Sequence, residues 1–172
     1  YFKRLFEEMI KNTTGNLLNA KQPIIIGHQV NCLGIMGAGI AKSIKSKWFN
    51  VFTEYTKFCN KFVSDKDLLG KCQLVPVDDK NIKYVANLFG EYSFAEAVAP
   101  FEGNRHTDYE ALEAALRSFK AQVIERGFKN AGVPYKLGCG LAGGDWDGVV
   151  YPMIKDEFGD DEDITLYIVK YN

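Results

Sequence analysis

Apolar residues follow two patterns along the chain, one typical of buried β-strands and one typical of helices that bury a single face. Short, β-branched apolar runs bounded by glycine, proline or polar turn residues predict strands. These runs lie at 10–18, 23–31, 69–77, 83–89, 131–137 and 164–171. The run at 23–31 contains three consecutive isoleucines, which predicts a strand buried on both of its faces.

Helical periodicity marks three other stretches. From 39 to about 62, large apolar residues recur at three- and four-residue steps, and the lysines between them fall on a solvated face. A capping box at Thr107–Glu110 begins a second helix, and Gly127 ends it. A third helix is expected from about Val149, with Pro152 in its first turn.

Strands and helices alternate in this reading, which predicts an α/β layered fold with a mixed sheet. A polar turn joins the strands at 69–77 and 83–89, so these two form a hairpin or a tight connection. No repeat, linker or low-complexity segment divides the chain. We therefore expect one domain over residues 10–172, preceded by an N-terminal extension, 1–9, of uncertain origin.

Composition narrows the classes of function. The formal net charge of −1 over 172 residues gives no electrostatic basis for sequence-independent binding to DNA or RNA. No apolar run approaches the length of a membrane span, so we expect no membrane contact and a location in the cytoplasm. The four cysteines lack zinc-binding spacing and only two histidines are present, so we expect neither a metal nor a cofactor. A monomer is the expected state.

Two glycine-rich turns are candidate binding loops. Val30–Ile40 and Gly138–Trp146 each follow an apolar run and precede a helical pattern. Glycine lacks a Cβ atom, so backbone N–H groups can surround an anion there, and a helix start adds unpaired donors. The two turns could hold a diphosphate from both sides, or they could serve only as tight connections. Gly34, Gly37 and Gly39 form GxxGxG, which is not the GxGxxG of dinucleotide-binding folds, and no Walker A motif is present.

These residues resemble the macro domain family, whose members bind ADP-ribose. His28–Ala41 is similar to the first ligand loop of macro domains, and Gly138–Trp146 is similar to the second. Thr14–Leu18, Leu68–Cys72 and Tyr84–Gly90 extend the resemblance in the expected order. The closest resemblance is to the branch of ADP-ribose-1''-phosphate phosphatases, which includes yeast and phage proteins. The resemblance implies a three-layer α/β/α fold and removal of the terminal phosphate from ADP-ribose-1''-phosphate.

Ligand-binding roles transfer by position within this resemblance. Asn16 occupies the place of an Asp that binds the adenine amino group, and its amide oxygen can still accept that hydrogen bond. Asn31 corresponds to the Asn that holds the distal ribose. Phe89 or Tyr92 could stack on a ring or could pack in the core. The implied ligand-binding residues are Gly15, Asn16, Leu17, Asn31, Met36, Gly37, Ala38, Gly39, Ile40, Gly138, Cys139, Gly140, Leu141, Ala142, Gly143 and Gly144.

Hydrolysis of a phosphomonoester also requires proton transfer and an oriented water. His28 is the candidate base, because an imidazole titrates near neutral pH, although it could equally satisfy a backbone carbonyl at a strand end. Asp145 could orient the water, or it could cap the helix that follows. Asn31 completes the candidate catalytic set.

Two other functions remain open. Related enzymes that remove ADP-ribose from acidic side chains or from DNA thymidine share a Gly-Cys-Gly-Leu turn like residues 138–141. Those enzymes add a catalytic lysine after the strand corresponding to 83–89, where this chain reads Asn-Leu-Phe-Gly-Glu-Tyr. The absent lysine disfavours that mechanism. The second alternative is a macro domain that binds an ADP-ribose signal without turnover.

Overall fold

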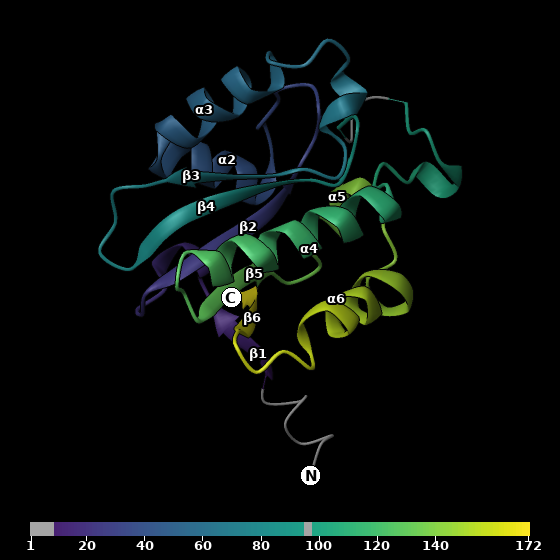
Figure 1. Cartoon of the computed structure of the whole chain (residues 1–172). Helices are drawn as coiled ribbons and strands as arrows, with labels where there is room; N and C mark the ends of the chain where they lie inside the picture. The colour runs from purple at the N-terminus through teal and green to yellow at the C-terminus, as the bar shows by residue number, and fades with distance from the viewer. Residues whose placement is uncertain (1–8, 95–97) are drawn as a thin grey trace.

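The computed structural model describes residues 9–94 and 98–172, which form a six-stranded sheet between two layers of helices (Figure 1). The strand order is β1-β6-β5-β2-β4-β3, and β3 alone runs antiparallel to its neighbour among these strands. The strands are β1 (Ile10–Gly15), β2 (Ile24–Val30), β3 (Cys72–Pro76), β4 (Ile82–Phe89), β5 (Asn130–Pro134) and β6 (Thr165–Tyr171). The predicted mixed sheet and three-layer α/β/α architecture are confirmed.

The centre of the sheet follows the sequence pattern closely. All seven residues of β2 are buried, as the isoleucine run predicts. β2 pairs in parallel with β4 on one side and with β5 on the other. β3 and β4 form the predicted hairpin, with Cys72 opposite Leu88 and Pro76 opposite Tyr84.

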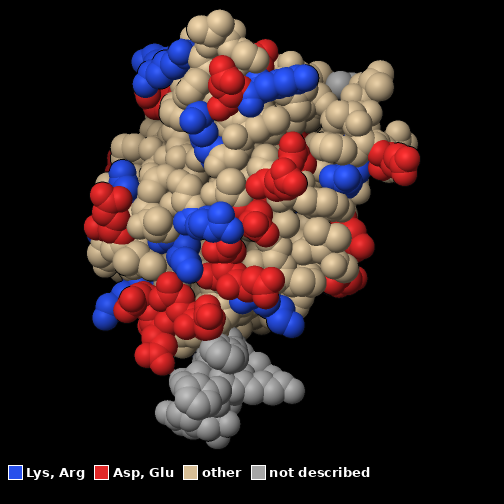
Figure 2. All heavy atoms as spheres, turned by 45° about the vertical axis from the view of Figure 1, so that its right-hand side comes forward, with Lys and Arg blue, Asp and Glu red and all other residues tan. Residues whose placement is uncertain are grey.

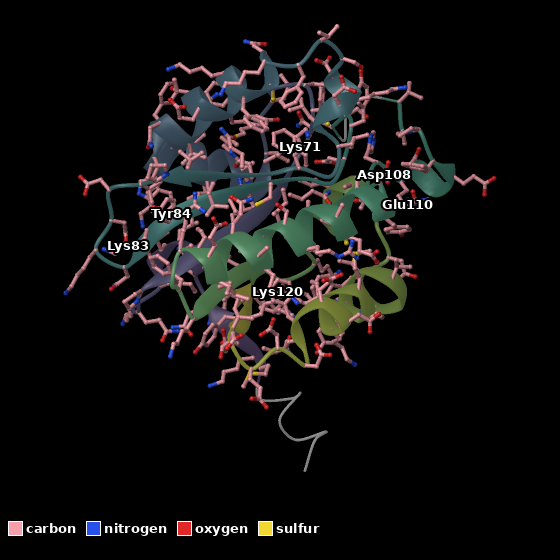
Figure 3. The ribbon with its side chains drawn as sticks, viewed as in Figure 1. Lys71, Lys83, Tyr84, Asp108, Glu110 and Lys120 are labelled. Atoms are coloured by element: carbon pink, nitrogen blue, oxygen red, sulfur yellow. The ribbon has the colours of Figure 1, made fainter. Side chains whose placement is uncertain are left out.

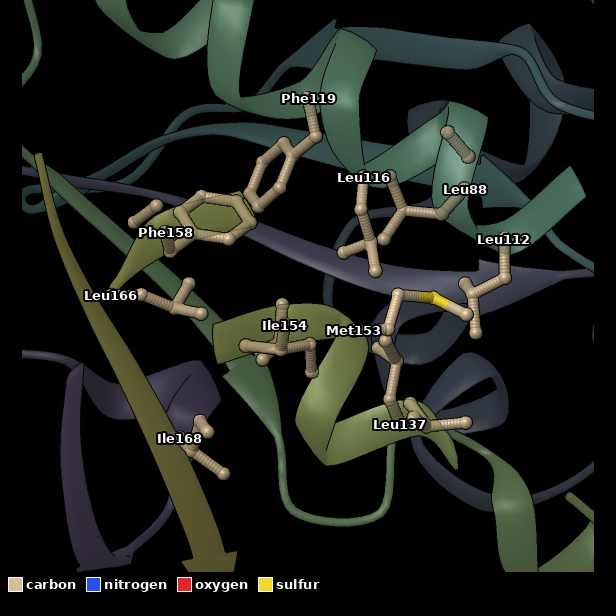
Figure 4. Packing of buried hydrophobic residues seen from close by; sticks show 14 of the residues in the cluster. Leu88, Leu112, Leu116, Phe119, Leu137, Met153, Ile154, Phe158, Leu166 and Ile168 are labelled. Carbon is tan, nitrogen blue, oxygen red and sulfur yellow. The ribbon is translucent and has the colours of Figure 1, made fainter. Parts of the chain in front are cut away.

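Helices cover both faces of the sheet, and each face has its own apolar cluster. One face packs against α2 (Gly39–Lys47) and α3 (Phe49–Cys59), with Ile44, Val51 and Tyr55 fully buried. The other face packs against α4 (Tyr109–Glu125) and α6 (Tyr151–Phe158). Figure 4 shows this second cluster, in which Phe119 of α4 lies beside Phe158 of α6, with ring centroids 6.4 Å apart. The remaining helices are short: η1 (Leu17–Asn19), η2 (Asp65–Leu68), η3 (Glu102–Asn104), α5 (Cys139–Ala142) and the π-helical turn η4 (Trp146–Val150).

Two element predictions are wrong in detail. The single helix predicted from 39 to about 62 is two helices, because Trp48 leaves helical geometry (φ −134°, ψ 86°) while its side chain stays buried. A periodicity argument does not detect a break of one residue when the apolar spacing continues across it. The cap of α4 is Asp108 rather than Thr107, since Asp108 accepts a hydrogen bond from the Ala111 N–H. Thr107 is used elsewhere: its hydroxyl accepts from the Gln29 side chain.

Other element boundaries differ from the predicted ones by a few residues. The first strand ends at Gly15, and the next residues form η1 instead of extending it. The third helix is confirmed with Pro152 in its first turn, although η4 precedes it.

Five parallel strands bring their carboxyl ends to one edge of the sheet, where ligands of α/β folds commonly bind. The loops after β2, β4 and β5 meet there. In Figure 3, Asp108 and Glu110 mark the start of α4 at this end, whereas Lys83 lies at the opposite end.

Candidate functional site

A cavity of about 240 Å³ opens between the loops that follow β2, β4 and β5. The described residues that line it come from four segments: Gln29, Val30, Asn31 and Ile35; Gly37, Ala38, Gly39, Ile40 and Ala41; Glu91 and Phe94; and Gly138 and Leu141. The two glycine-rich turns therefore meet around one space, as their sequence suggested. The Cβ atom that Gly39 lacks would lie 3.5 Å from Leu141 Cδ1, which shows how closely the turns approach each other.

The N-terminus of α2 forms one wall of the cavity. The first N–H groups of a helix have no partner within it, and Ala38 has no side chain that could cap them. The first turn carries no acidic residue that would compete for these donors. Gly39 adopts a left-handed φ of +57°, which allows the chain to turn from the loop into the helix. This wall is suited to an anion such as a diphosphate.

The loop after β2, residues 31–38, is shaped by the side chain of Asn31. Its Oδ1 accepts hydrogen bonds from the N–H groups of Leu33 (3.0 Å) and Ile35 (3.3 Å), and its Nδ2 donates to the Ile35 carbonyl (2.8 Å). The buried Tyr55 hydroxyl, from α3, shares its single proton between the Asn31 carbonyl at 2.6 Å and Asn31 Oδ1 at 2.9 Å. Asn31 therefore lines the cavity and also fixes the loop that surrounds it.

The loop after β5, residues 135–144, is shaped mainly by its backbone. Lys136, Leu137 and Gly138 all have positive φ, and the Cys139 N–H donates to the Lys136 carbonyl at 2.7 Å. At its far end, the Ala142 carbonyl accepts from the N–H groups of His106 and Thr107. The chain preceding α4 therefore holds this loop in place.

The structure brings part of the predicted ligand set to the cavity. Asn31, Gly37, Ala38, Gly39, Ile40, Gly138 and Leu141 line it. Met36, Cys139 and Ala142 are buried instead, and Gly140, Gly143 and Gly144 belong to the second loop without lining the cavity. Gly143 instead packs against the backbone of Asn104, which its missing Cβ would meet at 2.7 Å.

Gly15, Asn16 and Leu17 lie at the same sheet edge but outside the cavity. Asn16 caps η1, since its Oδ1 accepts from the Leu18 N–H at 3.0 Å. It borders a separate, open hollow of about 460 Å³ beside α2, together with Lys42 and Lys47.

His28 belongs to β2, its side chain points to the face covered by α2 and α3, and the structure does not bring its imidazole to the cavity. The side chain is fully buried, and its Nε2 is 2.7 Å from Asn87 Oδ1. Burial lowers the His28 pKa to about 4, and the hydrogen bond to Asn87 offsets only part of that effect. As placed, His28 packs within the centre of the sheet and does not line the cavity.

Asp145 takes the capping role that the sequence left open as the alternative to orienting a water. Its Oδ1 accepts from the Gly148 N–H at 2.9 Å, so it caps η4, and it does not line the cavity. Phe89 is also structural: it is fully buried, and its ring lies 5.8 Å from that of Tyr55 and 5.6 Å from that of Phe58.

Sequence reasoning missed Glu91 and Phe94, which line the cavity from the loop after β4. Glu91 is the sole ionisable side chain among the described residues of the lining. Burial raises the pKa of its carboxyl to about 7. The available signal was an acidic residue directly after Gly90, at the carboxyl end of the strand expected at 83–89.

Other classes of site receive no support from the described part of the chain. No group of three or more metal-binding side chains occurs within residues 9–94 and 98–172. Over those same residues, every helix is too short or too polar to cross a membrane. On the face drawn in Figure 2, lysine and arginine side chains are interspersed with aspartate and glutamate.

Comparison with known proteins identifies a family that this chain matches. The chain matches the Macro domain family over residues 28–153. It is 27% identical over 150 residues to the DNA ADP-ribosyl glycohydrolase of Mycobacterium tuberculosis, a match that covers 85% of this chain and 38% of that protein. It is 29% identical over 99 residues to the ADP-ribose 1''-phosphate phosphatase of Saccharomyces cerevisiae, a match that covers 57% of this chain and 50% of that protein. Both matches therefore cover at most half the length of the relative.

The solved structures agree with this assignment. The macrodomain of Mycobacterium tuberculosis DarG superposes on this chain with a TM-score of 0.75 at 26% identity. The superposition covers 94% of this chain and 97% of the DarG macrodomain.

Proposed function

Since the chain belongs to the macro domain family, we propose that it binds ADP-ribose in the cavity between its two glycine-rich loops and hydrolyses ADP-ribose-1''-phosphate to ADP-ribose and phosphate. The observation that carries the binding proposal is the uncapped N-terminus of α2, which faces the second loop across the cavity. Free backbone donors on one side and a left-handed glycine turn on the other suit a diphosphate.

In this proposal the ligand extends along the carboxyl edge of the sheet. The diphosphate lies between Gly39 and Leu141, and the distal ribose lies beside Asn31, in the part of the cavity that Glu91 and Phe94 border. The adenine lies toward the end of β1, where Gly15, Asn16 and Leu17 follow one another. Because the Asn16 amide oxygen already caps η1, adenine recognition there relies on backbone groups more than on a side-chain carboxylate.

The choice of phosphate as the released group rests on the resemblance to the phosphatase branch and on the yeast relative. A second candidate reaction, removal of ADP-ribose from modified DNA, is supported by the mycobacterial relative, which aligns over 85% of this chain. Both reactions release a group attached to C1'' of the distal ribose, so they require the same cavity. Binding without turnover is the third possibility.

Two parallel measurements test the proposal. ADP-ribose is titrated calorimetrically, and phosphate release from ADP-ribose-1''-phosphate is followed beside release of ADP-ribose from a modified thymidine oligonucleotide. We expect ADP-ribose binding with phosphate release. Release from the oligonucleotide alone would transfer the assignment to the second reaction, and binding alone would indicate a reader.

The site itself is tested by Gly39→Glu, which places a carboxylate and a strained left-handed residue where the anion is expected. We expect ADP-ribose affinity to fall by at least about 100-fold, which is about 3 kcal/mol. Gly127→Glu is the matched control, because Gly127 also has a left-handed φ (+77°) and nothing within 4 Å, but it follows α4 at the opposite end of the sheet. Equal affinity in the two variants would refute the assigned site.

A further inference from the structure

We propose that Glu91 is the catalytic acid of this site, donating a proton to the leaving oxygen on C1'' of the distal ribose. This inference rests on the proposed hydrolase function and adds to it the residue that transfers the proton. It stands on the position of the Glu91 side chain and on the way its backbone is anchored.

Position distinguishes Glu91 from the other candidates. It lines the cavity together with Asn31 and Phe94, at the end assigned to the distal ribose. His28 and Asp145, the two ionisable residues expected to act, lie outside that lining. Among the described residues of the cavity, proton transfer by a side chain can therefore come from Glu91 alone.

The backbone of Glu91 is anchored from two directions. It forms a β-bridge with Thr107, just before α4, and its carbonyl accepts from the Cys32 Sγ at 3.4 Å. The backbone carbonyl of the next residue, Tyr92, accepts from the Cys32 N–H at 2.9 Å. The side chain is therefore presented from a fixed segment that links the loop after β2 to the start of α4, as a catalytic group requires.

An unpaired buried oxygen lies next to this segment. The Gln29 side chain donates from its Nε2 to the Thr107 hydroxyl at 3.2 Å, but its Oε1 has no partner among the described residues. Gly90 makes room for it, since a Cβ there would lie 2.7 Å from that oxygen. A buried acceptor without a partner is costly, and the fold keeps this one directly beside the segment that carries Glu91.

The electrostatic surroundings favour the protonated acid. Burial raises the Glu91 pKa to about 7, so much of the carboxyl is protonated at neutral pH. The groups that interact with it are Cys32 and Tyr55, whose pKa values are raised by burial, so both are neutral at that pH. The carboxylates of Asp65 and Asp108, from other elements, act with Glu91 on the Cys32 thiol and raise its pKa. A bound phosphate would favour the protonated form further.

In the proposed step, a water oxygen forms a bond to phosphorus as the bond between phosphorus and the C1'' oxygen breaks. The electron pair of the broken bond stays on the sugar oxygen, which takes the Glu91 proton and becomes the hydroxyl of ADP-ribose. One proton of the attacking water passes to the emptied carboxylate, and the other remains on the released hydrogen phosphate.

The test compares Glu91→Gln with wild type and with Glu102→Gln, a control that removes an exposed carboxyl from η3. We expect Glu91→Gln to keep ADP-ribose affinity within about threefold while kcat falls by about 100-fold or more. Glu102→Gln should match wild type. In wild type, kcat/KM, which reports the free enzyme, should be highest below pH 7 and fall about tenfold per pH unit above it, because the carboxylate cannot donate a proton.

The outcomes separate this inference from the proposed function. If wild type is active and Glu91→Gln retains more than a third of its kcat, Glu91 is not the acid while the hydrolase assignment stands. A kcat/KM that rises through pH 7 would also overturn the inference, since it would indicate a base. If wild type binds ADP-ribose but releases no product from either substrate, both the hydrolase and its acid are refuted.

Discussion

The two loops that face each other across the cavity hold their shapes by different means. The loop at 31–38 is fixed by side chains: the Asn31 amide bonds to the backbone of Leu33 and Ile35, and Tyr55 of α3 holds that amide in turn. The loop at 135–144 depends on backbone conformation, with positive φ at Lys136, Leu137, Gly138 and Gly143. The first loop is therefore coupled to a helix on one face of the sheet, and the second depends on glycine and on close backbone contact.

This difference gives each loop its own sensitivity. Removal of a remote hydroxyl should loosen the first loop, whereas addition of one methyl group should distort the second. The strands that lead into the two loops differ as well: β2 carries the buried His28, whereas β5 carries no ionisable residue.

The largest expected effect concerns the second loop. Gly143→Ala places a Cβ 2.7 Å from the Asn104 carbonyl oxygen at a left-handed φ of +72°. Strain and overpacking together should lower the free energy of unfolding by about 3 kcal/mol, as measured by urea denaturation. Gly140→Ala, in α5 with no atom within 4 Å of its Cβ, should change it by less than about 1 kcal/mol. Equal losses in the two variants would contradict the backbone account of this loop.

The second effect concerns the strand beneath the first loop. The folded protein takes up the His28 proton only near pH 4, whereas the unfolded chain takes it up near the ordinary value of 6.5. The stabilising contribution of neutral His28 is thus complete above about pH 6.5 and is lost as the pH falls toward 4. Wild type should lose about 2 kcal/mol more than His28→Gln between pH 7 and pH 5 in urea unfolding. Parallel pH curves for the two proteins would show that the imidazole is not buried as described.

The smallest effect concerns the hydrogen bonds from the Tyr55 hydroxyl to Asn31, which hold the first loop. Tyr55→Phe removes the hydroxyl that bonds to Asn31 and leaves the Asn31 carbonyl without that partner. We expect a loss of about 1 kcal/mol in the free energy of unfolding and a weaker ADP-ribose affinity, both absent in Tyr171→Phe, whose side chain is exposed. If the free energy of unfolding falls but ADP-ribose affinity does not, the Tyr55 hydroxyl stabilises the core and does not shape the binding loop.

Much of the fold could be predicted because its signals are local. The isoleucine run at β2, the polar turn between β3 and β4, and the proline at the start of α6 each have a direct physical reading, and all three are confirmed. The break at Trp48 could not be predicted, because the apolar spacing continues across it and the Trp48 side chain stays buried.

Within the candidate site, residue types alone pointed to two side chains, His28 and Asp145, that do not line the cavity. His28 is the best proton acceptor by ordinary pKa, but the alternation of β2 turns it to the face covered by α2 and α3, where it contacts Asn87. Asp145 is a favourable cap for the turn that follows it, and that local role is the one it takes. Glu91 was not singled out from the sequence, because its place in the site depends on a cavity formed by segments far apart in the chain.

The sequence by itself determined the layered α/β fold and the two glycine turns, because strand burial, helix starts and left-handed turns depend on residues close together in the chain. Tertiary structure decided which side chains reach the cavity. That outcome depends on the face to which each strand residue points and on the burial that sets each pKa, and both are fixed only when distant segments pack together. Glu91 reaches the cavity with a raised pKa, and His28 does not reach it, for this reason.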